Sequence, residues 1–243
     1  DQEGGTVQRL NPKKGFQAYF PSAERIVKTR SLKTAYNLYL NMGKSLSIMG
    51  FNLNFGTVLD LQTKRKSPAI SAKQRSFSKN PKTVARYAEV MIDAHREMGV
   101  VTAVKHFPGH GSAIHDTHTH VADVTPYWSS KELVPYKRLI KRSKVDMVMT
   151  AHILHTDIDS EYPATLSPFH INYTLRRKLK YDGVVITDDL QMKAIQSQFS
   201  LEKSVIHALK AGCDILLFAN RVAYDEDIAE QVHHIVLKHP LKN

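Results

Sequence analysis

Residues 100–118 read VVTAVKHFPGHGSAIHDTH. The apolar, β-branched residues 100–104 predict a buried strand, and Pro108, Gly109 and Gly111 end regular structure soon after it. The segment that follows this strand is dense in titratable groups: Lys105, His106, His110, His115, Asp116 and His118. Histidine is the side chain best suited to proton transfer near neutral pH. We therefore interpret the loop after this strand as the active site.

Helical and strand-like patterns alternate along the chain. Helical patterns cover residues 23–49, 80–98, 129–142, 167–179, 200–211 and 225–238, and strand patterns cover 51–61, 100–104, 145–150, 183–186 and 213–219. Such alternation predicts a parallel β-sheet in an α/β fold. Polar residues recur just after the strands, at Asp60, Lys105, His106, His152, Asp188 and Asn220. Because catalytic groups of a β/α barrel project from the C-terminal ends of several strands, this pattern favours a TIM-type (β/α)8 barrel.

A doubly wound open sheet is the alternative parallel fold. It would concentrate its site at one switch point, often with a glycine-rich phosphate-binding turn. No GxGxxG or GxxxxGK(S/T) motif follows a strand in this sequence. The chain has neither a repeat of solenoid length nor a low-complexity linker, so we expect residues 1–243 to form one catalytic domain.

The composition is that of an ordinary globular protein, with 42% hydrophobic and 23% charged residues. A formal net charge of +11 would suit a polyanion, but the cations are spread along the chain without a nucleic-acid-binding motif. We therefore expect a solvated basic surface and no nucleic-acid partner. No apolar run approaches the roughly 20 residues needed to cross a bilayer, so we expect no transmembrane segment. Cys213 is the only cysteine, which excludes an internal disulfide.

Two acidic motifs are candidates for chemistry. Asp116 and His118 are two residues apart, a spacing that lets a carboxylate hold one ring nitrogen and leave the other for acid/base work. Asp188 directly follows the strand pattern, where a carboxylate is a candidate nucleophile or stabiliser of positive charge. Its neighbour Asp189 suits either a helix cap or a hydrogen-bond anchor.

The first ten residues offer a further candidate site. Asp1, Glu3 and Arg9 surround the pair Gly4-Gly5, whose glycines permit close approach of the backbone to a ligand. Carboxylates paired with a guanidinium would suit sugar hydroxyl groups, and a capped turn is the alternative interpretation.

A metal site is not expected. His106 and His110 have the HxxxH spacing of metal ligands on a helix. Pro108 and Gly109 lie between them and disfavour that helix, so we expect neither a metal nor another cofactor.

Several motifs, taken in order, identify a family. They are DQEGGTVQRL at 1–10, TVLDL at 57–61, RSF at 75–77, KHFPGHG at 105–111 with the downstream Asp116-x-His118, and ITDDLQMKAI at 186–195. Together they resemble family 3 of the glycoside hydrolases, and most closely its N-acetyl-β-glucosaminidase branch. The resemblance implies a β/α barrel, and a retaining exo-glycosidase that removes terminal β-linked N-acetylglucosamine from peptidoglycan fragments. It also implies bacterial cell-wall recycling, and we expect a monomer in the cytoplasm.

The resemblance also implies roles for individual residues. Asp188 is similar to the nucleophile that forms a covalent glycosyl-enzyme intermediate. His118 is similar to the general acid/base, and Asp116 to the partner that orients it. The positions that match those holding the terminal sugar are Asp1, Arg9, Arg75, Lys105 and His106.

Two other functions stay open. One is a carbohydrate- or peptidoglycan-binding barrel without turnover, and the other is a glycoside phosphorylase of the same family. The chain departs from the family at Thr6, where relatives usually carry arginine. Only about five of the eight barrel strands can be placed in the sequence as given, so we expect the N-terminal strands to be absent from it.

Overall fold

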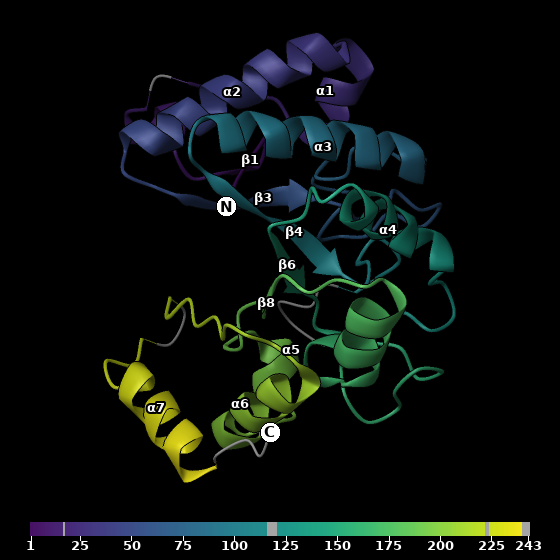
Figure 1. The fold of residues 1–243 in the computed structure, drawn as a ribbon, viewed down its shortest axis with the longest axis vertical. Coiled ribbons are helices and arrows are strands. Elements are labelled where there is room, and N and C mark those ends of the chain that lie inside the picture. The colour runs from purple at the N-terminus through teal and green to yellow at the C-terminus, as the bar shows by residue number, and fades with distance from the viewer. Residues whose placement is uncertain (17, 116–120, 222–223, 240–243) are drawn as a thin grey trace.

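The computed structural model describes residues 1–16, 18–115, 121–221 and 224–239. Its centre is a parallel sheet of β3 (Leu53–Val58), β4 (Val101–Phe107), β6 (Met147–Thr150) and β8 (Val184–Ile186), hydrogen-bonded in that order (Figure 1). A parallel bridge between Ile186 and Ile215 extends the sheet beyond β8. Each strand thus pairs with the next one along the chain. This is the order of a β/α barrel, whereas a doubly wound sheet reverses its order at a switch point.

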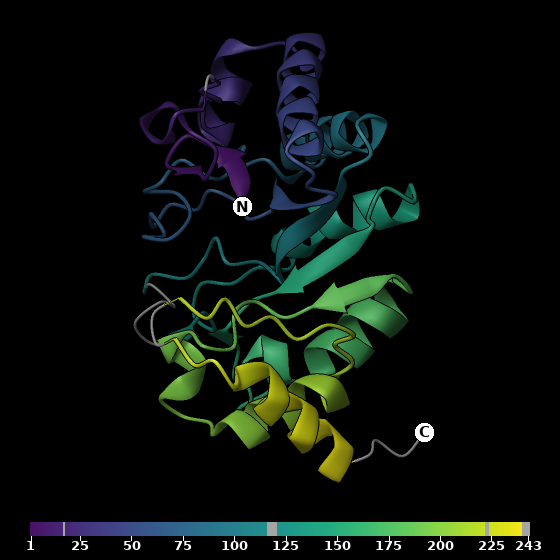
Figure 2. The same ribbon diagram turned by 90° about the vertical axis from the view of Figure 1, so that its left-hand side faces the viewer.

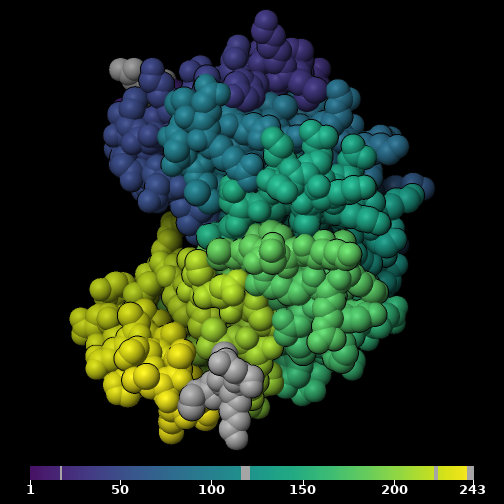
Figure 3. All heavy atoms as spheres, viewed as in Figure 1, coloured from purple at the N-terminus to yellow at the C-terminus, as the bar shows by residue number. Residues whose placement is uncertain are grey.

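A helix follows each strand and covers the sheet from outside. α3 (Pro81–Glu97) connects β3 to β4, α4 (Val134–Lys141) lies between β4 and β6, η4 (Phe169–Lys178) lies between β6 and β8, and α6 (Leu201–Ala211) follows β8. The arrowheads of the strands and the loops that follow them lie on the left of Figure 2, away from most of these helices. In the space-filling view the colours form successive bands in chain order, as sequential winding requires (Figure 3).

Side chains of the sheet alternate between two apolar clusters. Val104, Val148 and Val185 belong to the main core, which the sheet shares with the helices. Their neighbours belong to a second cluster on the opposite face, made of Ala103, Met147, Met149 and Ile186 with Leu53, Phe55 and Leu217 packed against it. Because successive side chains of a strand point to opposite faces, this second cluster occupies the face that lines a barrel's interior.

The barrel is open within the part of the chain that the structure describes, where β3 and residues 213–219 stay at opposite edges of the sheet. Two small sheets flank it: an antiparallel hairpin of β1 (Gln2–Gly4) and β2 (Val7–Gln8), and a parallel pair of β5 (Ala122–Asp123) and β7 (Ile153–Leu154). The predicted α/β fold with a parallel sheet is confirmed. The described strands form an open sheet and do not close the predicted (β/α)8 barrel. No helix within the described ranges is long and apolar enough to cross a membrane.

Several predicted elements differ in their bounds. The helix predicted at 23–49 is two helices, α1 (Ala23–Thr29) and α2 (Leu32–Ile48), because the Ser31 hydroxyl accepts from Thr34 N and starts a second helix. The helix predicted at 129–142 begins with a separate helical turn, η2 (Ser130–Leu133), which the Ser129 side chain caps before α4. Residues 213–219 form a β-bridge through Ile215 but no regular strand. The remaining short elements are η1 (Pro12–Lys14), η3 (Ala164–Leu166) and α5 (Lys193–Gln196), and the last helix is α7 (Ile228–Lys238).

The core predicts a contrast between two isoleucines. Ile92 on α3 is fully buried, whereas Ile48 at the end of α2 is 74% exposed. Ile92→Ala should lower the free energy of unfolding by about 2–5 kcal/mol, because it removes buried methyl groups and leaves a cavity. The control Ile48→Ala should change it by less than about 0.5 kcal/mol. Urea denaturation followed by circular dichroism measures both; equal losses would contradict the core assigned to α3.

Candidate active site

Three of the polar residues that follow the strands, Lys105, His106 and Asp188, line one cavity of about 700 Å³. Six of the residues predicted to form the site line it: Asp1, Arg9, Arg75, Lys105, His106 and Asp188. Its apolar wall includes Phe55, Met149 and Leu217, which belong to the inner cluster of the sheet. The cavity therefore lies at the C-terminal mouth of the sheet, the position of catalytic sites in β/α barrels.

Glu3 is the centre of an ion network on one side of this cavity. The Arg75 guanidinium donates to both of its carboxylate oxygens, from Nε and Nη2, at 2.8 Å each. Lys105 Nζ lies 2.8 Å from Glu3 Oε1 and 2.6 Å from Asp1 Oδ1. Burial alone would raise the pKa of Glu3, but Lys105 and Arg75 outweigh it and lower that pKa to about 2. Glu3 therefore stays ionised and fixes both cations at the edge of the cavity.

Arg9 extends the network toward solvent. Its Nη2 lies 3.0 Å from Asp1 Oδ2, and its side chain is half exposed. The hairpin of β1 and β2 brings the two residues together, because Gln2 in β1 pairs with Gln8 in β2, next to Arg9. One carboxylate of Asp1 thus links a buried lysine to an exposed arginine.

A second buried carboxylate, Asp60, holds the turn that carries His106. Its Oδ2 accepts from His106 Nδ1 at 2.7 Å, and its Oδ1 accepts from the backbone N–H groups of His106 and His110 at 3.2 and 2.7 Å. Burial raises the pKa of Asp60, but the two histidines outweigh this effect and lower it to about 2. An ionised Asp60 places the Nδ1 proton on His106 and leaves Nε2 near Arg75, 3.4 Å from its Nη2.

Asp188 follows β8 and is held by its own neighbour. The Asp189 N–H group donates to Asp188 Oδ1 at 2.8 Å. Burial alone would raise the pKa of Asp188, but His152, His106, the Asp189 N–H group and Lys105 together hold it below its ordinary value. The carboxylate is therefore ionised at neutral pH, as a nucleophile must be.

Asp189 acts as a hydrogen-bond anchor rather than as a helix cap. Its carboxylate Oδ1 accepts from Gln191 N at 3.0 Å and from Ala219 N at 3.1 Å. It thereby ties the turn after β8 to the neighbouring segment of the sheet.

The acid/base candidates Asp116 and His118 lie outside the described residues. The described base of their loop is held by Glu132, whose carboxylate accepts from Gly111 N at 3.1 Å and from the Ser112 hydroxyl. Burial raises the pKa of Glu132 to about 8. Gly111 must be a glycine, because a Cβ there would lie 2.1 Å from the carbonyl oxygen of Leu61.

The sequence identifies Glu3 as a candidate site residue and Asp60 as a polar residue after a strand, but it gives neither their buried partners nor any role for Glu132. The partners of Glu3 and Asp60 are 72 and 46 residues away. For Asp60, the signal in the sequence is its position directly after an apolar strand.

The described residues offer no metal centre, since no group of three His, Cys, Asp or Glu side chains among them is placed to hold an ion. The rings of His106 and His110 lie 5.7 Å apart between centroids, with His106 engaged by Asp60.

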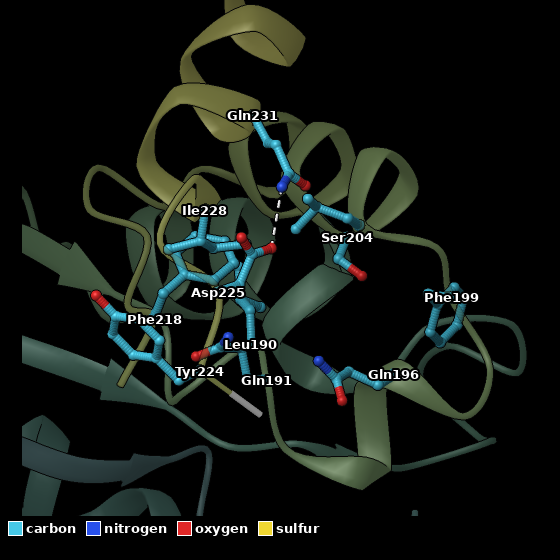
Figure 4. Close-up of a pocket in the computed structure, with 11 residues that line it drawn as sticks. Leu190, Gln191, Gln196, Phe199, Ser204, Phe218, Tyr224, Asp225, Ile228 and Gln231 are labelled. Carbon is cyan, nitrogen blue, oxygen red and sulfur yellow. Dashed lines mark hydrogen bonds between the residues drawn. The ribbon is translucent and has the colours of Figure 1, made fainter. Parts of the chain in front are cut away.

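A second cavity, of about 300 Å³, lies beside α5, α6 and the start of α7 (Figure 4). Its walls are mostly apolar or amide side chains, including Leu190, Phe199 and Phe218. Asp225 is the one ionisable carboxylate in this wall, and its Oδ2 accepts from Gln231 Nε2 at 2.9 Å. Apart from Asp225, the described residues of this wall carry no charge, whereas the larger cavity is lined by eight Asp, Lys and Arg residues, so we assign no chemistry to the smaller one.

Comparisons with known proteins agree with this geometry. The family model described as the N-terminal domain of glycosyl hydrolase family 3 matches residues 1–240. The chain is similar to a beta-hexosaminidase of Actinobacillus pleuropneumoniae serotype 3 (35% identity over 229 residues, 90% of this chain and 64% of the relative). It is also similar to a beta-hexosaminidase of Tolumonas auensis (36% identity, 92% of this chain and 66% of the relative). The chain thus spans 64% of the length of the first of these relatives.

Two solved structures have the same fold over nearly the whole chain. One is a family 3 β-N-acetylglucosaminidase from Paenibacillus sp. FPU-7, with a TM-score of 0.87, 32% identity, and coverage of 98% of this chain and 44% of that chain. The other is a β-N-acetylhexosaminidase from Beutenbergia cavernae, with a TM-score of 0.88, 29% identity, and coverage of 98% and 70%.

The Glu3 network makes stability depend on pH. The pKa of Glu3 falls from 4.5 to about 2 on folding, so its contribution of about 3 kcal/mol is complete above pH 4.5 and is lost as the pH falls toward 2. Glu3→Gln should remove that part of the acid dependence and also destabilise the protein at pH 7, because buried Arg75 and Lys105 lose the negative charge that they share. Denaturant titrations between pH 2.5 and 7 test this, with the exposed Glu226→Gln as control. An unchanged acid profile in Glu3→Gln would refute the network.

Proposed function

Because the chain belongs to glycosyl hydrolase family 3, we propose that this protein is a retaining exo-glycosidase. Its substrate is a terminal β-linked N-acetylglucosamine of a peptidoglycan fragment. The beta-hexosaminidase relatives support the sugar, and the single observation that supports the chemistry is the cavity where Asp188 meets the Asp1–Lys105–Glu3–Arg75 network.

The proposed reaction has two steps. The ionised Asp188 carboxylate attacks the anomeric carbon, forms a glycosyl ester, and the bond to the leaving oxygen breaks. His118 gives its proton to that oxygen, with Asp116 orienting the ring and stabilising its charged form. His118 then takes a proton from water, which attacks the same carbon, and Asp188 is released as a carboxylate. An imidazole starts near a suitable pKa, whereas a glutamic acid in this role must have its pKa raised by its surroundings.

The network around Glu3 supplies the groups that hold the terminal sugar. Lys105 and Arg9 provide donors on either side of the Asp1 carboxylate, which accepts from sugar hydroxyl groups. His106 presents Nε2 and Arg75 its remaining N–H groups at the same wall. Since these groups are fixed by Glu3 and Asp60 before any sugar arrives, binding does not have to order them.

Phosphorolysis is a second candidate, supported by the charge of the cavity. Among the described residues that line it, five are Lys or Arg (Arg9, Lys73, Arg75, Lys105 and Arg221) and three are Asp. This excess of cations would tolerate an attacking phosphate. Assays of chromophore release from an aryl N-acetyl-β-glucosaminide, with and without phosphate and beside the matching β-glucoside, separate the functions. Formation of N-acetylglucosamine 1-phosphate would show that the reaction is phosphorolysis and not hydrolysis. Binding without turnover would support a carbohydrate-binding protein.

The nucleophile is tested by Asp188→Asn. We expect kcat on the aryl substrate to fall by at least about 1000-fold, because an amide cannot form the glycosyl ester. The thermal midpoint should stay close to that of the native protein. Asp182→Asn, an exposed position just before β8, is the matched control and should keep native activity. A near-native rate in Asp188→Asn would overturn the assignment.

The acid is tested by His118→Ala with two leaving groups. On a natural β-linked disaccharide we expect kcat/KM to fall by about 10²–10⁴-fold, the usual contribution of general acid catalysis. On an aryl glycoside with a good leaving group the loss should be under about tenfold in the first step, since that oxygen needs little protonation. His115→Ala, an exposed histidine of the same loop, should affect neither substrate. Equal losses on both substrates would argue against an acid role for His118.

A further inference from the structure

His152 lies directly behind the turn that carries Asp188. It follows β6, is 1% exposed, and is not part of the cavity wall. Both of its ring nitrogens have partners: Nε2 lies 2.9 Å from the carbonyl oxygen of Asp189, and Nδ1 lies 2.8 Å from Thr165 Oγ1. None of the steps of the proposed reaction uses this buried imidazole.

The partners of the ring define its tautomer. A carbonyl oxygen can only accept, so Nε2 carries the proton and donates it to Asp189. Burial lowers the pKa of His152, so the ring is neutral near pH 7. Nδ1 is then an acceptor, and it shares the single proton of the Thr165 hydroxyl with the carbonyl oxygen of Ala151, which lies 2.9 Å from Thr165 Oγ1.

Asp189 in turn fixes the carboxylate of Asp188. Its N–H group donates to Asp188 Oδ1 at 2.8 Å, while its own carboxylate is tied to the backbone of Gln191 and Ala219. The bond from His152 holds the remaining polar group of Asp189, its carbonyl oxygen. The N–H group, the side chain and the carbonyl group of Asp189 are therefore all hydrogen-bonded, and these bonds restrict the orientation of the turn.

We infer that His152 is a positioning residue for the proposed nucleophile, which it orients through the backbone of Asp189. The inference rests on the proposed function for its catalytic consequence. It assigns His152 a role distinct from those of His106, which lines the sugar side of the cavity, and of His118. The charged and titratable groups that act on Asp188 from other elements are His106, Lys105 and Arg75.

Position 152 requires a side chain whose hydrogen-bond donor reaches the carbonyl oxygen of Asp189. In His152→Phe the ring volume remains but the donor is lost, so the Asp189 carbonyl oxygen keeps only the Met192 N–H group at 3.0 Å and the turn is held less tightly. In His152→Gln an amide N–H group can still reach that carbonyl oxygen. Thr165→Val removes the donor to Nδ1 and keeps a similar side-chain volume, and Thr165→Ser is its conservative counterpart.

The experiment compares kcat, KM and the pH profile of these variants on the aryl N-acetyl-β-glucosaminide. For His152→Phe we expect kcat to fall about 100-fold, the scale of a misplacement of about 1 Å in a reacting group. KM should change by less than about threefold, because the sugar-binding residues are untouched. The acid limb of kcat/KM should move to higher pH, since a displaced turn weakens the hydrogen bond from the Asp189 N–H group that lowers the pKa of Asp188. His152→Gln should restore kcat to within about tenfold of native.

A structural role alone would give a different result. If His152→Phe and His152→Gln lose activity equally, in proportion to their thermal destabilisation and without a shifted acid limb, the inference is wrong. Native kcat in His152→Phe would overturn it as well. If His152→Phe does not fold, Thr165→Val and Thr165→Ser provide the same comparison with a smaller perturbation, and equal kcat and acid limbs in that pair would count against the role.

One further measurement separates this inference from the proposed function. The Asp188 carboxyl can be titrated by carbon NMR in native protein and in His152→Phe, with its signal assigned from Asp188→Asn. A higher pKa in His152→Phe supports the positioning role even if the native protein cleaves no glycoside, an outcome that would refute only the function. An unchanged pKa overturns the positioning role whatever the activity.

Discussion

The active-site cavity depends on one buried carboxylate, Glu3. It joins three distant parts of the chain: the β1–β2 hairpin that carries it, the loop of Arg75, and the end of β4 at Lys105. Removing it would take the paired carboxylate from buried Arg75 and leave Lys105 to Asp1, which costs far more than losing an exposed ion pair. The side chains proposed to bind the sugar are therefore held in place by a carboxylate that does not line the cavity.

The fold was largely readable from the sequence because its signals are local. Alternating strand and helix patterns predicted a parallel sheet, and polar residues after several strands predicted sequential barrel order rather than a single switch point. The errors came from competing local interactions. The Ser31 cap divided a long helical pattern, and η4 has the side-chain pattern of an α-helix but π-helical hydrogen bonds. The apolar run at 213–219 forms a β-bridge with β8 at Ile215 and hydrogen bonds through Asp214 but no regular strand, which its composition could not reveal.

The candidate site was predictable as a set of residue types and much less as a set of partners. Lys105 and His106 were found from the density of titratable groups around them, and Asp188 from its place after a strand. The cavity brings these three together with Asp1, Arg9 and Arg75. The roles of Glu3, Asp60 and Glu132 could not be found in the same way, because a buried acid is identified by the cations or N–H groups that approach it from distant segments.

Glu132 holds the described base of the loop that leads to the proposed acid/base pair. Its effect on stability depends on pH in the opposite direction to that of Glu3 and Asp60. Glu3 and Asp60 ionise more readily in the folded chain, so acid weakens the folded state through them. The pKa of Glu132 is raised to about 8, so each step toward alkali from its ordinary value near 4.5 weakens the folded state instead. Because these effects oppose each other, the contribution of the three buried acids to stability is largest at mildly acidic pH. A more alkaline compartment would therefore favour replacement of Glu132, a buried residue that does not line the larger cavity.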